Sequence, residues 1–324
     1  MTRVFVTRRW PVDPGPILGS FAHVDVFAPD RAPTRDELID RARSCAAIVT
    51  SVADRIDRDV LDELRAVKVI AQAAVGYDNV DVATCRARGI LVTHTPDVLT
   101  DSTADLAIAL LLGVARRVRE GEEMVRAGQF GGWSPTMLLG IELRDKTLGV
   151  LGYGRIGRAV AQRARAFGMR VIASRRDDQR FVDPMPHGGS IEGVSREDLI
   201  ARSDVISVHV PGTRATRHLL GEREFARMKR GVIVLNTARG TVIDEGALVR
   251  ALESGHVGGA GLDVYEEEPR VHPGLIARDD VVLLPHLGSA TREARARMAS
   301  TALADAARVI RGLPPLHLVP ELRA

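Results

Sequence analysis

The stretch Thr147-Leu-Gly-Val-Leu-Gly-Tyr-Gly-Arg-Ile-Gly157 decides the fold of this chain. Its first five residues form an apolar run that predicts a buried strand, and an amphipathic stretch that predicts a helix follows. The glycines at 152, 154 and 157 fall between that strand and that helix, which is the context that makes a GxGxxG pattern specific. A chance glycine-rich turn is the alternative, and it does not account for the elements on either side.

The three glycines have separate physical roles in such a loop. Gly152 permits a tight turn, Gly154 lets the backbone approach a pyrophosphate, and Gly157 lets the helix pack closely on the strand. Arg155 and Ile156 lie where the helix begins, and the free N–H groups of a helix N-terminus face an anion. We therefore expect these five residues to bind a dinucleotide.

Short apolar runs alternate with amphipathic stretches along the whole chain. The predicted strands are Arg3–Thr7, Val24–Phe27, Ala46–Thr50, Lys68–Ala71 and Ile90–Val92, and then Thr147–Leu151, Arg170–Ala173, Asp204–Val208, Val232–Leu235, Gly259–Asp263 and Val281–Leu284. This alternation predicts an α/β fold with doubly wound parallel sheets. The six strands of the second series are the number expected of a complete dinucleotide-binding domain.

The predicted helices suggest where the domains divide. Ser102–Ala127 and Ser289–Arg311 each read as one long helix, and Thr34-Arg-Asp-Glu37 reads as a capping box that begins a shorter one. We expect a flavodoxin-like substrate-binding domain of residues 1–99 and 289–324 and a Rossmann dinucleotide-binding domain of residues 100–288. A cleft between two such domains is a common place for a ligand site.

Composition excludes several classes of protein. The 324 residues are 45% hydrophobic and 27% charged, as in ordinary globular domains. The apolar stretch near Leu106–Val114 is far shorter than the ~20 residues that span a bilayer, and the first residues lack the apolar core of a signal peptide. We therefore expect a cytoplasmic protein with no membrane partner.

Charge and cysteine content exclude other partners. Cys45 and Cys85 provide neither a disulfide framework nor a zinc-binding spacing, so we expect both to be buried and no metal to be bound. The 45 basic residues are interleaved with 42 acidic ones, and only 4% of residues are aromatic. No basic stripe with aromatic residues is present, so we expect no nucleic-acid partner.

The end of the second strand in the dinucleotide-binding series selects the cofactor. A site specific for NADH places a carboxylate there to accept hydrogen bonds from the ribose hydroxyls. This chain instead has Ser174, Arg175 and Arg176, and a guanidinium group binds a phosphate with two parallel hydrogen bonds. We therefore expect NADPH to be preferred over NADH. The alternatives are that the arginines are merely solvated, or that Asp177 or Asp178 is the acceptor.

Five further segments carry a resemblance to a known family. Asn236–Gly240, Gly261–Pro269 and Leu284–Thr291 each follow a predicted strand, at the sheet edge where α/β proteins bind ligands. With Val75–Asn79 and Leu99–Asp105 in the first half, the chain resembles the D-isomer-specific 2-hydroxyacid dehydrogenases over nearly its whole length.

The resemblance implies the catalytic and substrate-binding residues. Arg239 matches the arginine that holds the carboxylate and carbonyl oxygen of the substrate, and Glu268 and His286 match an acid–histidine pair. The backbone at Val75 and Gly76 matches the loop that binds the substrate carboxylate. The implied cofactor-binding residues also include Thr103, Val210, Pro211, Thr237, Ala238, Asp263, His286 and Gly288.

The chemistry of 2-keto acid reduction requires these residue types for independent reasons. Hydride addition leaves negative charge on the carbonyl oxygen, and histidine is the side chain that donates a proton near neutral pH. A nearby carboxylate stabilises the charged imidazole, and a guanidinium group orients the substrate carboxylate. The alternatives are a packed loop histidine at 286 and a solvated acidic run at Glu266–Glu268.

Several segments are similar to the glyoxylate/hydroxypyruvate reductase branch of this family: Val4–Arg8, Trp133–Gly140 and the Ser-Arg-Arg at 174–176. The resemblance implies NADPH-dependent reduction of glyoxylate or hydroxypyruvate to glycolate or D-glycerate by a homodimer that uses the predicted helix Ser102–Ala127. A reductase of bulkier 2-keto acids and a 3-phosphoglycerate dehydrogenase are the alternatives among enzymes. A dinucleotide-sensing corepressor-like binding protein is the alternative outside enzymes.

Overall fold

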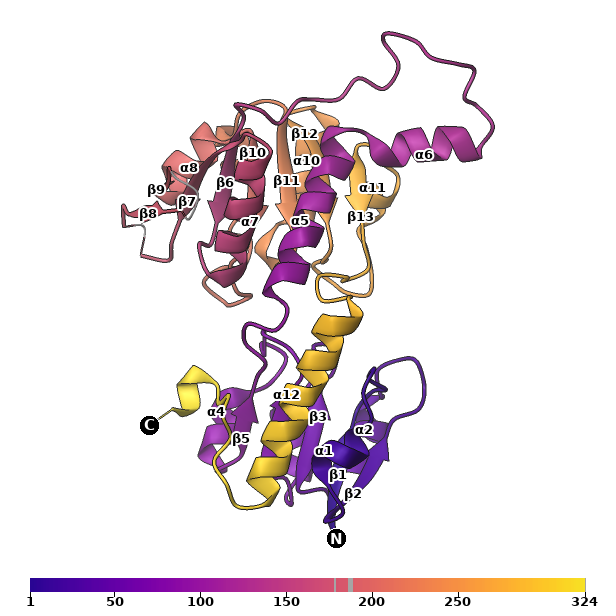
Figure 1. Ribbon diagram of the computed structural model, residues 1–324, viewed down its shortest axis with the longest axis vertical. Helices are drawn as coiled ribbons and strands as arrows, with labels where there is room; N and C mark the ends of the chain where they lie inside the picture. The colour runs from indigo at the N-terminus through magenta and orange to yellow at the C-terminus, as the bar shows by residue number, and fades with distance from the viewer. Residues whose placement is uncertain (178, 186–188, 324) are drawn as a thin grey trace. The chain divides into compact units, whose positions relative to one another are not determined.

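The computed structural model describes residues 1–177, 179–185 and 189–323 (Figure 1). The chain forms two compact units, one of Met1–Leu99 with Ala290–Ala324 and the other of Thr100–Ser289. Each unit is an α/β sheet covered by helices on both faces, and all strands are parallel except one at the edge of the second sheet, so the expected fold class is confirmed.

The first unit contains a five-stranded parallel sheet in the order β2-β1-β3-β4-β5. Its strands are β1 Thr2–Val6, β2 Ala22–Val26, β3 Ala47–Thr50, β4 Val69–Gln72 and β5 Leu91–Thr93. Every residue of β3 and β4 is buried, because helices cover both faces of the sheet at its centre.

Two helices cover one face of this sheet and three cover the other. The helices are α1 Pro14–Leu18 and α12 Arg292–Ile310 on one face, and α2 Arg35–Ala42, α3 Arg58–Glu63 and α4 Val82–Ala87 on the other. The short 3₁₀ helix Pro320–Leu322 follows them in the chain. The predicted capping box is confirmed, since the Thr34 hydroxyl accepts from the Glu37 N–H and the Glu37 carboxylate accepts from the Thr34 N–H.

The second unit contains an eight-stranded sheet in the order β13-β12-β11-β10-β6-β7-β9-β8, parallel except for β8. Its strands are β6 Thr147–Leu151, β7 Arg170–Ser174, β8 Val182–Pro184, β9 Ser190–Gly193, β10 Val205–Val208, β11 Val232–Asn236, β12 Val257–Leu262 and β13 Val281–Leu283. The order reverses between β6 and β10, which is where a doubly wound sheet binds its ligand.

Helices cover both faces of this sheet as well. Helices α5 Thr100–Ala115 and α7 Arg155–Ala166 pack on one face, and α8 Arg196–Arg202, α9 Glu222–Arg227 and α10 Glu245–Glu253 pack on the other. The unit also contains α6 Val118–Arg126, α11 Pro273–Ile276 and the 3₁₀ turn Gly240–Val242. Val150 of β6 packs on the side of α5 and α7, and Leu151 packs on the side of α8, α9 and α10, because successive side chains of a strand point to opposite faces.

Two predicted helices differ from the structure, and two strands were not predicted. The single helix predicted over Ser102–Ala127 is two helices, because Arg117 adopts a left-handed conformation (φ 51°) and the apolar stripe of α5 does not continue into α6. The helix predicted from Ser289 begins at Arg292, where the Thr291 hydroxyl caps it. The sheet also contains β8 and β9, which the sequence did not predict, because these strands are only three and four residues long.

Candidate active site

Three predicted residues lie on segments that follow neighbouring strands of the second sheet. Arg239 follows β11, Glu268 follows β12, and His286 follows β13. The Nδ1 atom of His286 lies 3.0 Å from Oε2 of Glu268, so the structure brings the expected acid–histidine pair together. Both side chains remain accessible, with His286 31% and Glu268 38% exposed, as groups that meet a substrate must be.

The environment of Glu268 favours its charged form. Burial acts to raise the pKa of this carboxyl group, but the hydrogen bond and the positive charge of His286 act against it. The N–H of Tyr265 donates to Oε1 over 3.1 Å, and the charge of Arg239 adds to the effect. The net result is a pKa of Glu268 below its ordinary value, so the carboxylate is an anion at neutral pH.

A turn built on Asn236 fixes the backbone that leads to Arg239. The Asn236 amide donates to the carbonyl of Arg239 over 2.9 Å, and its oxygen accepts from the N–H of Ala238 over 3.0 Å. Gly240 is required next, because a Cβ there would lie 1.8 Å from the carbonyl carbon of Tyr265. The segment is therefore held from both sides at the edge of the sheet.

Asp263 fixes the loop that carries His286. Its carboxylate, 1% exposed as a residue, accepts from the N–H groups of Leu287 over 2.6 Å and of Gly288 over 2.8 Å. The Thr103 hydroxyl of α5 donates to the Gly288 carbonyl over 3.1 Å. Burial raises the pKa of Asp263 above its ordinary value, although the two N–H donors act to lower it. These contacts hold His286 in a left-handed conformation, with φ at 56°.

The glycine loop has the geometry that its sequence predicts. A Cβ at Gly152 would lie 2.7 Å from the backbone of His209, and one at Gly157 would lie 2.3 Å from the carbonyl oxygen of Gly152. A Cβ at Gly154, by contrast, would meet no heavy atom within 4 Å. Arg155 and Ile156 form the first turn of α7. The backbone at Gly154 is thus open to a pyrophosphate at the N-terminus of α7.

The other predicted cofactor residues lie at the ends of β7, β10 and β11. Ser174 is buried at the end of β7, and Arg175 and Arg176 follow it on the surface. Asp177 accepts from the N–H of Gln179 over 3.3 Å, and Asp178 lies outside the described residues. Val210 and Pro211 follow β10, and Thr237 and Ala238 follow β11.

The residues present fit a bound dinucleotide. The Thr237 hydroxyl is shielded from solvent and has no hydrogen-bond partner among the described residues. It lies in the segment predicted to bind the cofactor, so a bound dinucleotide would account for the missing partner. The open approach to Gly154 is a second feature that such a ligand accounts for.

The predicted substrate loop, Val75 and Gly76, belongs to the first unit. Gln72, buried at the end of β4, donates to the Gly76 carbonyl over 3.2 Å, and the ring of His94 contacts the Val75 carbonyl at 3.1 Å. The Thr50 hydroxyl donates to the Gln72 amide oxygen over 2.7 Å and so orients that amide. The loop is fixed by partly buried hydrogen bonds within its own unit.

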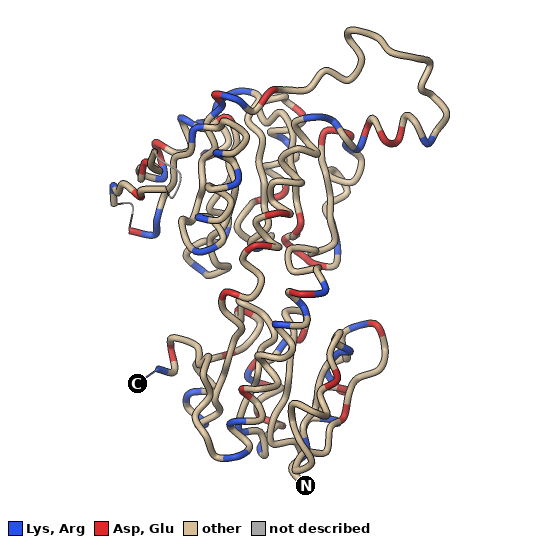
Figure 2. Tube along the Cα trace, in the orientation of Figure 1, with Lys and Arg blue, Asp and Glu red and all other residues tan. Residues whose placement is uncertain are grey.

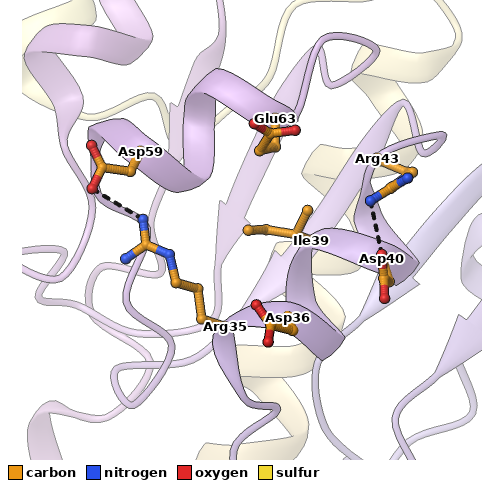
Figure 3. Close-up of a pocket in the computed structure, with 7 residues that line it drawn as sticks. All are labelled: Arg35, Asp36, Ile39, Asp40, Arg43, Asp59 and Glu63. Atoms are coloured by element: carbon orange, nitrogen blue, oxygen red, sulfur yellow. Dashed lines mark hydrogen bonds and ion pairs between the residues drawn. The ribbon is translucent and has the colours of Figure 1, made fainter.

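One surface hollow in the first unit lies between α2 and α3 (Figure 3). It contains the ion pairs Arg35–Asp59 at 3.2 Å and Arg43–Asp40 at 2.8 Å. Its lining residues are Arg35, Asp36, Ile39, Asp40, Arg43, Asp59 and Glu63. None of the predicted site residues lines it, so this hollow is separate from the candidate active site.

Two kinds of feature are absent from the described parts of the chain. No cluster of three or more His, Cys, Asp or Glu side chains suited to a metal ion occurs there. Within the same residues, no helix has both the length and the apolar character needed to cross a bilayer. Acidic and basic residues are both distributed along the trace in each unit (Figure 2).

Comparison with known proteins identifies the family. The model of the NAD binding domain of D-isomer specific 2-hydroxyacid dehydrogenases matches residues 108–288. This chain belongs to the D-isomer specific 2-hydroxyacid dehydrogenase family. The dehydrogenase is 45% identical over 321 residues to the glyoxylate reductase of Thermococcus litoralis, a match that covers 98% of this chain and 96% of the relative.

Solved structures agree with this assignment. The dehydrogenase is similar to a glyoxylate reductase from Paecilomyes thermophila, with a TM-score of 0.86, 36% identity and 99% of each chain covered. It is also similar to the NADPH-dependent glyoxylate/hydroxypyruvate reductase of Sinorhizobium meliloti in complex with NADP and malonate, with a TM-score of 0.82 and 31% identity. That match covers 100% of this chain and 99% of the other. The resemblance inferred from the motifs is confirmed, and the dehydrogenase is an NAD(P)-dependent oxidoreductase of small 2-keto and 2-hydroxy acids.

Sequence reasoning missed two residues that position the site of the dehydrogenase. Tyr265 supplies the N–H that holds Glu268, and its hydroxyl donates to the Leu284 carbonyl over 2.8 Å. Asn236 forms the turn before Arg239. The signal for Asn236 was its place directly after a strand, where a side-chain amide favours a turn. No comparable signal marked Tyr265.

Proposed function

We propose that this dehydrogenase reduces glyoxylate or hydroxypyruvate to glycolate or D-glycerate, with NADPH as the cofactor. The observation that carries the proposal is the 3.0 Å contact between His286 and Glu268 on segments that follow adjacent strands. Relatives that bear the name glyoxylate reductase, at 45% identity over nearly the whole chain, support the choice of substrate.

The roles of the three site residues follow from their chemistry. Arg239 binds the substrate carboxylate and polarises the carbonyl group through its fork of N–H donors. Because Nδ1 of His286 faces Glu268, its Nε2 is the nitrogen left to donate a proton to the carbonyl oxygen. Glu268 keeps the imidazole oriented and stabilises its charged form. NADPH supplies the hydride when it is bound.

The proposed cofactor site combines the glycine loop with the end of β7. The loop of Gly152, Gly154 and Gly157 would bind the pyrophosphate. Arg155 and Ile156, in the first turn of α7, would lie beside it. Ser174, Arg175 and Arg176 would bind the 2′-phosphate and so favour NADPH. Val210, Pro211, Thr237, Ala238, Asp263, Gly288 and Thr103 complete the proposed set.

Substrate binding in this proposal also uses the first unit. The backbone at Val75 and Gly76 would bind the substrate carboxylate, as the family resemblance implies. The partly buried hydrogen bond from Gln72 to the Gly76 carbonyl supports a loop of fixed geometry. A loop that is already ordered binds a small anion at a lower entropic cost than a mobile one.

We further propose a cytoplasmic homodimer. Helix α6 and the loop after it project from the rest of the second unit (Figure 1) and expose large apolar side chains. These are Val118, Val125, Phe130, Trp133 and Leu139, each more than half exposed. A second copy of the chain would cover them. Both cysteines are free and buried, which suits a reducing compartment. A monomer in sedimentation at micromolar concentration would contradict the dimer.

A panel of 2-keto acids tests the proposed activity. Glyoxylate, hydroxypyruvate, pyruvate, phenylpyruvate and 3-phosphohydroxypyruvate are each reduced with NADPH and, in parallel, with NADH. We expect the highest kcat/KM for glyoxylate or hydroxypyruvate with NADPH. A higher kcat/KM for phenylpyruvate or 3-phosphohydroxypyruvate would contradict the proposed substrate class. A higher kcat/KM with NADH would contradict the proposed cofactor preference. No turnover of any keto acid would favour a binding protein.

A further inference from the structure

Arg175 lies against a pair of stacked aromatic rings in the second unit. The rings of Tyr153 and Phe181 have centroids 5.2 Å apart and planes inclined by 26°. The guanidinium carbon of Arg175 lies 3.9 Å from the centroid of the Phe181 ring and 5.7 Å from that of Tyr153. These distances are those of cation–π contacts, which attract a guanidinium group to the face of a ring.

The aromatic pair is itself anchored. The Tyr153 hydroxyl donates to Asp183 Oδ2 over 2.6 Å, and Arg158 donates to Asp183 Oδ1 over 3.0 Å. Tyr153 is 8% exposed, and burial, together with its bond to Asp183, raises the pKa of its hydroxyl, which therefore remains a donor.

Phe181 is held from the other side by β9. A Cβ at Gly193 would lie 2.2 Å from the Phe181 ring, so only a glycine leaves room for it there. The N–H of Gly193 also donates to the Phe181 carbonyl over 2.7 Å. Strands β9 and β8 extend the sheet beyond β7 (Figure 1), and Phe181 directly precedes β8. Its ring therefore lies next to Arg175, the residue that follows β7.

The stack orders Arg175 without neutralising it. Among the described residues, no carboxylate forms an ion pair with Arg175, and the nearby Asp183 is bound to Tyr153 and Arg158. An exposed arginine otherwise loses side-chain entropy when it binds a ligand, and contact with a ring reduces that loss in advance. The N–H groups at the edge of the guanidinium plane stay available to an anion.

We propose that Phe181 and Tyr153 are positioning residues for cofactor selectivity, which hold Arg175 in place for the 2′-phosphate of NADPH. This inference rests on the cofactor preference proposed above. It assigns a function to the segment that leads into β8: Phe181, held against Gly193 of β9, supplies the ring that orders the phosphate-binding arginine. Phe181 acts through Arg175 and has no contact with the reacting atoms.

Calorimetric titration with NADP⁺ and with NAD⁺ tests the inference on the full-length protein without substrate. F181L should weaken NADP⁺ binding about threefold to thirtyfold, the range of a cation–π contact, and leave NAD⁺ binding within about twofold. F181Y keeps the ring and should bind both nucleotides like the wild type. F167L, which shortens an exposed phenylalanine at the end of α7, is the matched control.

The double variant R175A/F181L separates positioning from a general structural effect. Once Arg175 is removed, F181L should change the NADP⁺/NAD⁺ affinity ratio no further than R175A alone. An equal additional loss in that background, or an unchanged ratio in F181L, would overturn the inference while the NADPH preference stands. An unchanged ratio in R175A would overturn the cofactor preference itself, and the role of Phe181 with it.

Discussion

The Nδ1 atom of His286 lies 3.0 Å from Oε2 of Glu268, and the N–H of Tyr265 holds the other carboxylate oxygen at 3.1 Å. This arrangement fixes the imidazole ring and directs its second nitrogen away from the acid. Because the pKa of Glu268 lies below its ordinary value, the anion persists across the neutral range. The pair thus has the properties of a proton donor in ketone reduction.

Replacing His286 should abolish the proton transfer and leave cofactor binding intact. H286N retains a polar side chain but cannot carry the proton, so kcat for glyoxylate reduction should fall by roughly 10²–10⁴-fold. Stopped-flow measurement of NADPH oxidation gives the rate, and fluorescence titration gives the NADPH affinity. H23N, at an exposed histidine of the first unit, is the control. A variant that retains more than about a tenth of the rate would exclude His286 as the donor.

Replacing Arg239 by lysine should separate charge from geometry. R239K retains the cation but loses the planar fork, so kcat/KM for glyoxylate should fall by roughly 10²–10³-fold. Its affinity for NADPH and its thermal midpoint should stay close to those of the wild type. R230K, at an exposed arginine of the same unit, should behave like the wild type. Equal activity of R239K and R230K would remove Arg239 from the site.

The parts of the fold and site that could be predicted are those with strong local signals. The loop from Gly152 to Gly157 was predictable because glycine spacing is dictated by backbone clashes, which the structure shows at Gly152 and Gly157. Arg239, Glu268 and His286 were predictable because each follows an apolar strand in a recognisable motif. Their actual proximity depended on strand order, which the motifs implied only through the family.

Other parts had no sufficient signal in the sequence. Strands β8 and β9 are short and polar, so the stack of Phe181 on Tyr153 depends on a pairing that local patterns do not encode. Helix α5 and helix α6 are separated at Arg117, although the residues on both sides favour a helix. The position of this break depends on where the buried surface of α5 ends, because α6 has no buried residues. The support that Tyr265 gives depends on a hydrogen bond from its hydroxyl to the carbonyl of Leu284, which is distant in the sequence, so it becomes visible only in the folded chain.

Reversing the charge at Arg175 should change the cofactor preference. R175D should weaken NADPH by about tenfold to a hundredfold, because it removes a charged hydrogen-bond donor to the 2′-phosphate. NADH should be unaffected or improved, since a carboxylate can accept from the ribose hydroxyls. Michaelis constants for both cofactors give the comparison. R180D, which makes the same charge change on the same connecting segment, is the control. Equal effects in the two variants would indicate a general electrostatic change.

His209 should make the stability of the protein depend on pH. Burial lowers the pKa of this histidine to about 4, and Nε2 lies 2.7 Å from the Ser207 hydroxyl. The unfolded chain takes up a proton near pH 6.5 and the folded chain only near pH 4, so stability is fully present above pH 6.5 and is lost as the pH falls toward 4. Between pH 7.5 and 5.0 the loss should reach about 2 kcal/mol.

Urea unfolding of the wild type and of H209Q at several pH values isolates this contribution. The free energy of unfolding of H209Q should fall less steeply between pH 7.5 and 5.0 than that of the wild type. H23Q, at an exposed histidine, should follow the wild type. Parallel curves for all three proteins would show that His209 is protonated equally easily in the folded and unfolded states.

The central claim is that His286, paired with Glu268, transfers the proton. The most direct test measures the rates of the forward and reverse reactions as a function of pH, under conditions in which the chemical step limits the rate. Glyoxylate reduction needs the charged imidazole and should fall as the pH rises, whereas glycolate oxidation needs the neutral ring and should rise over the same range. E268Q removes the anion that stabilises the charged ring and should move both curves to lower pH. Mirrored curves that shift together in E268Q are the predicted result, and curves that fail to mirror each other, or that stay in place in E268Q, would contradict it.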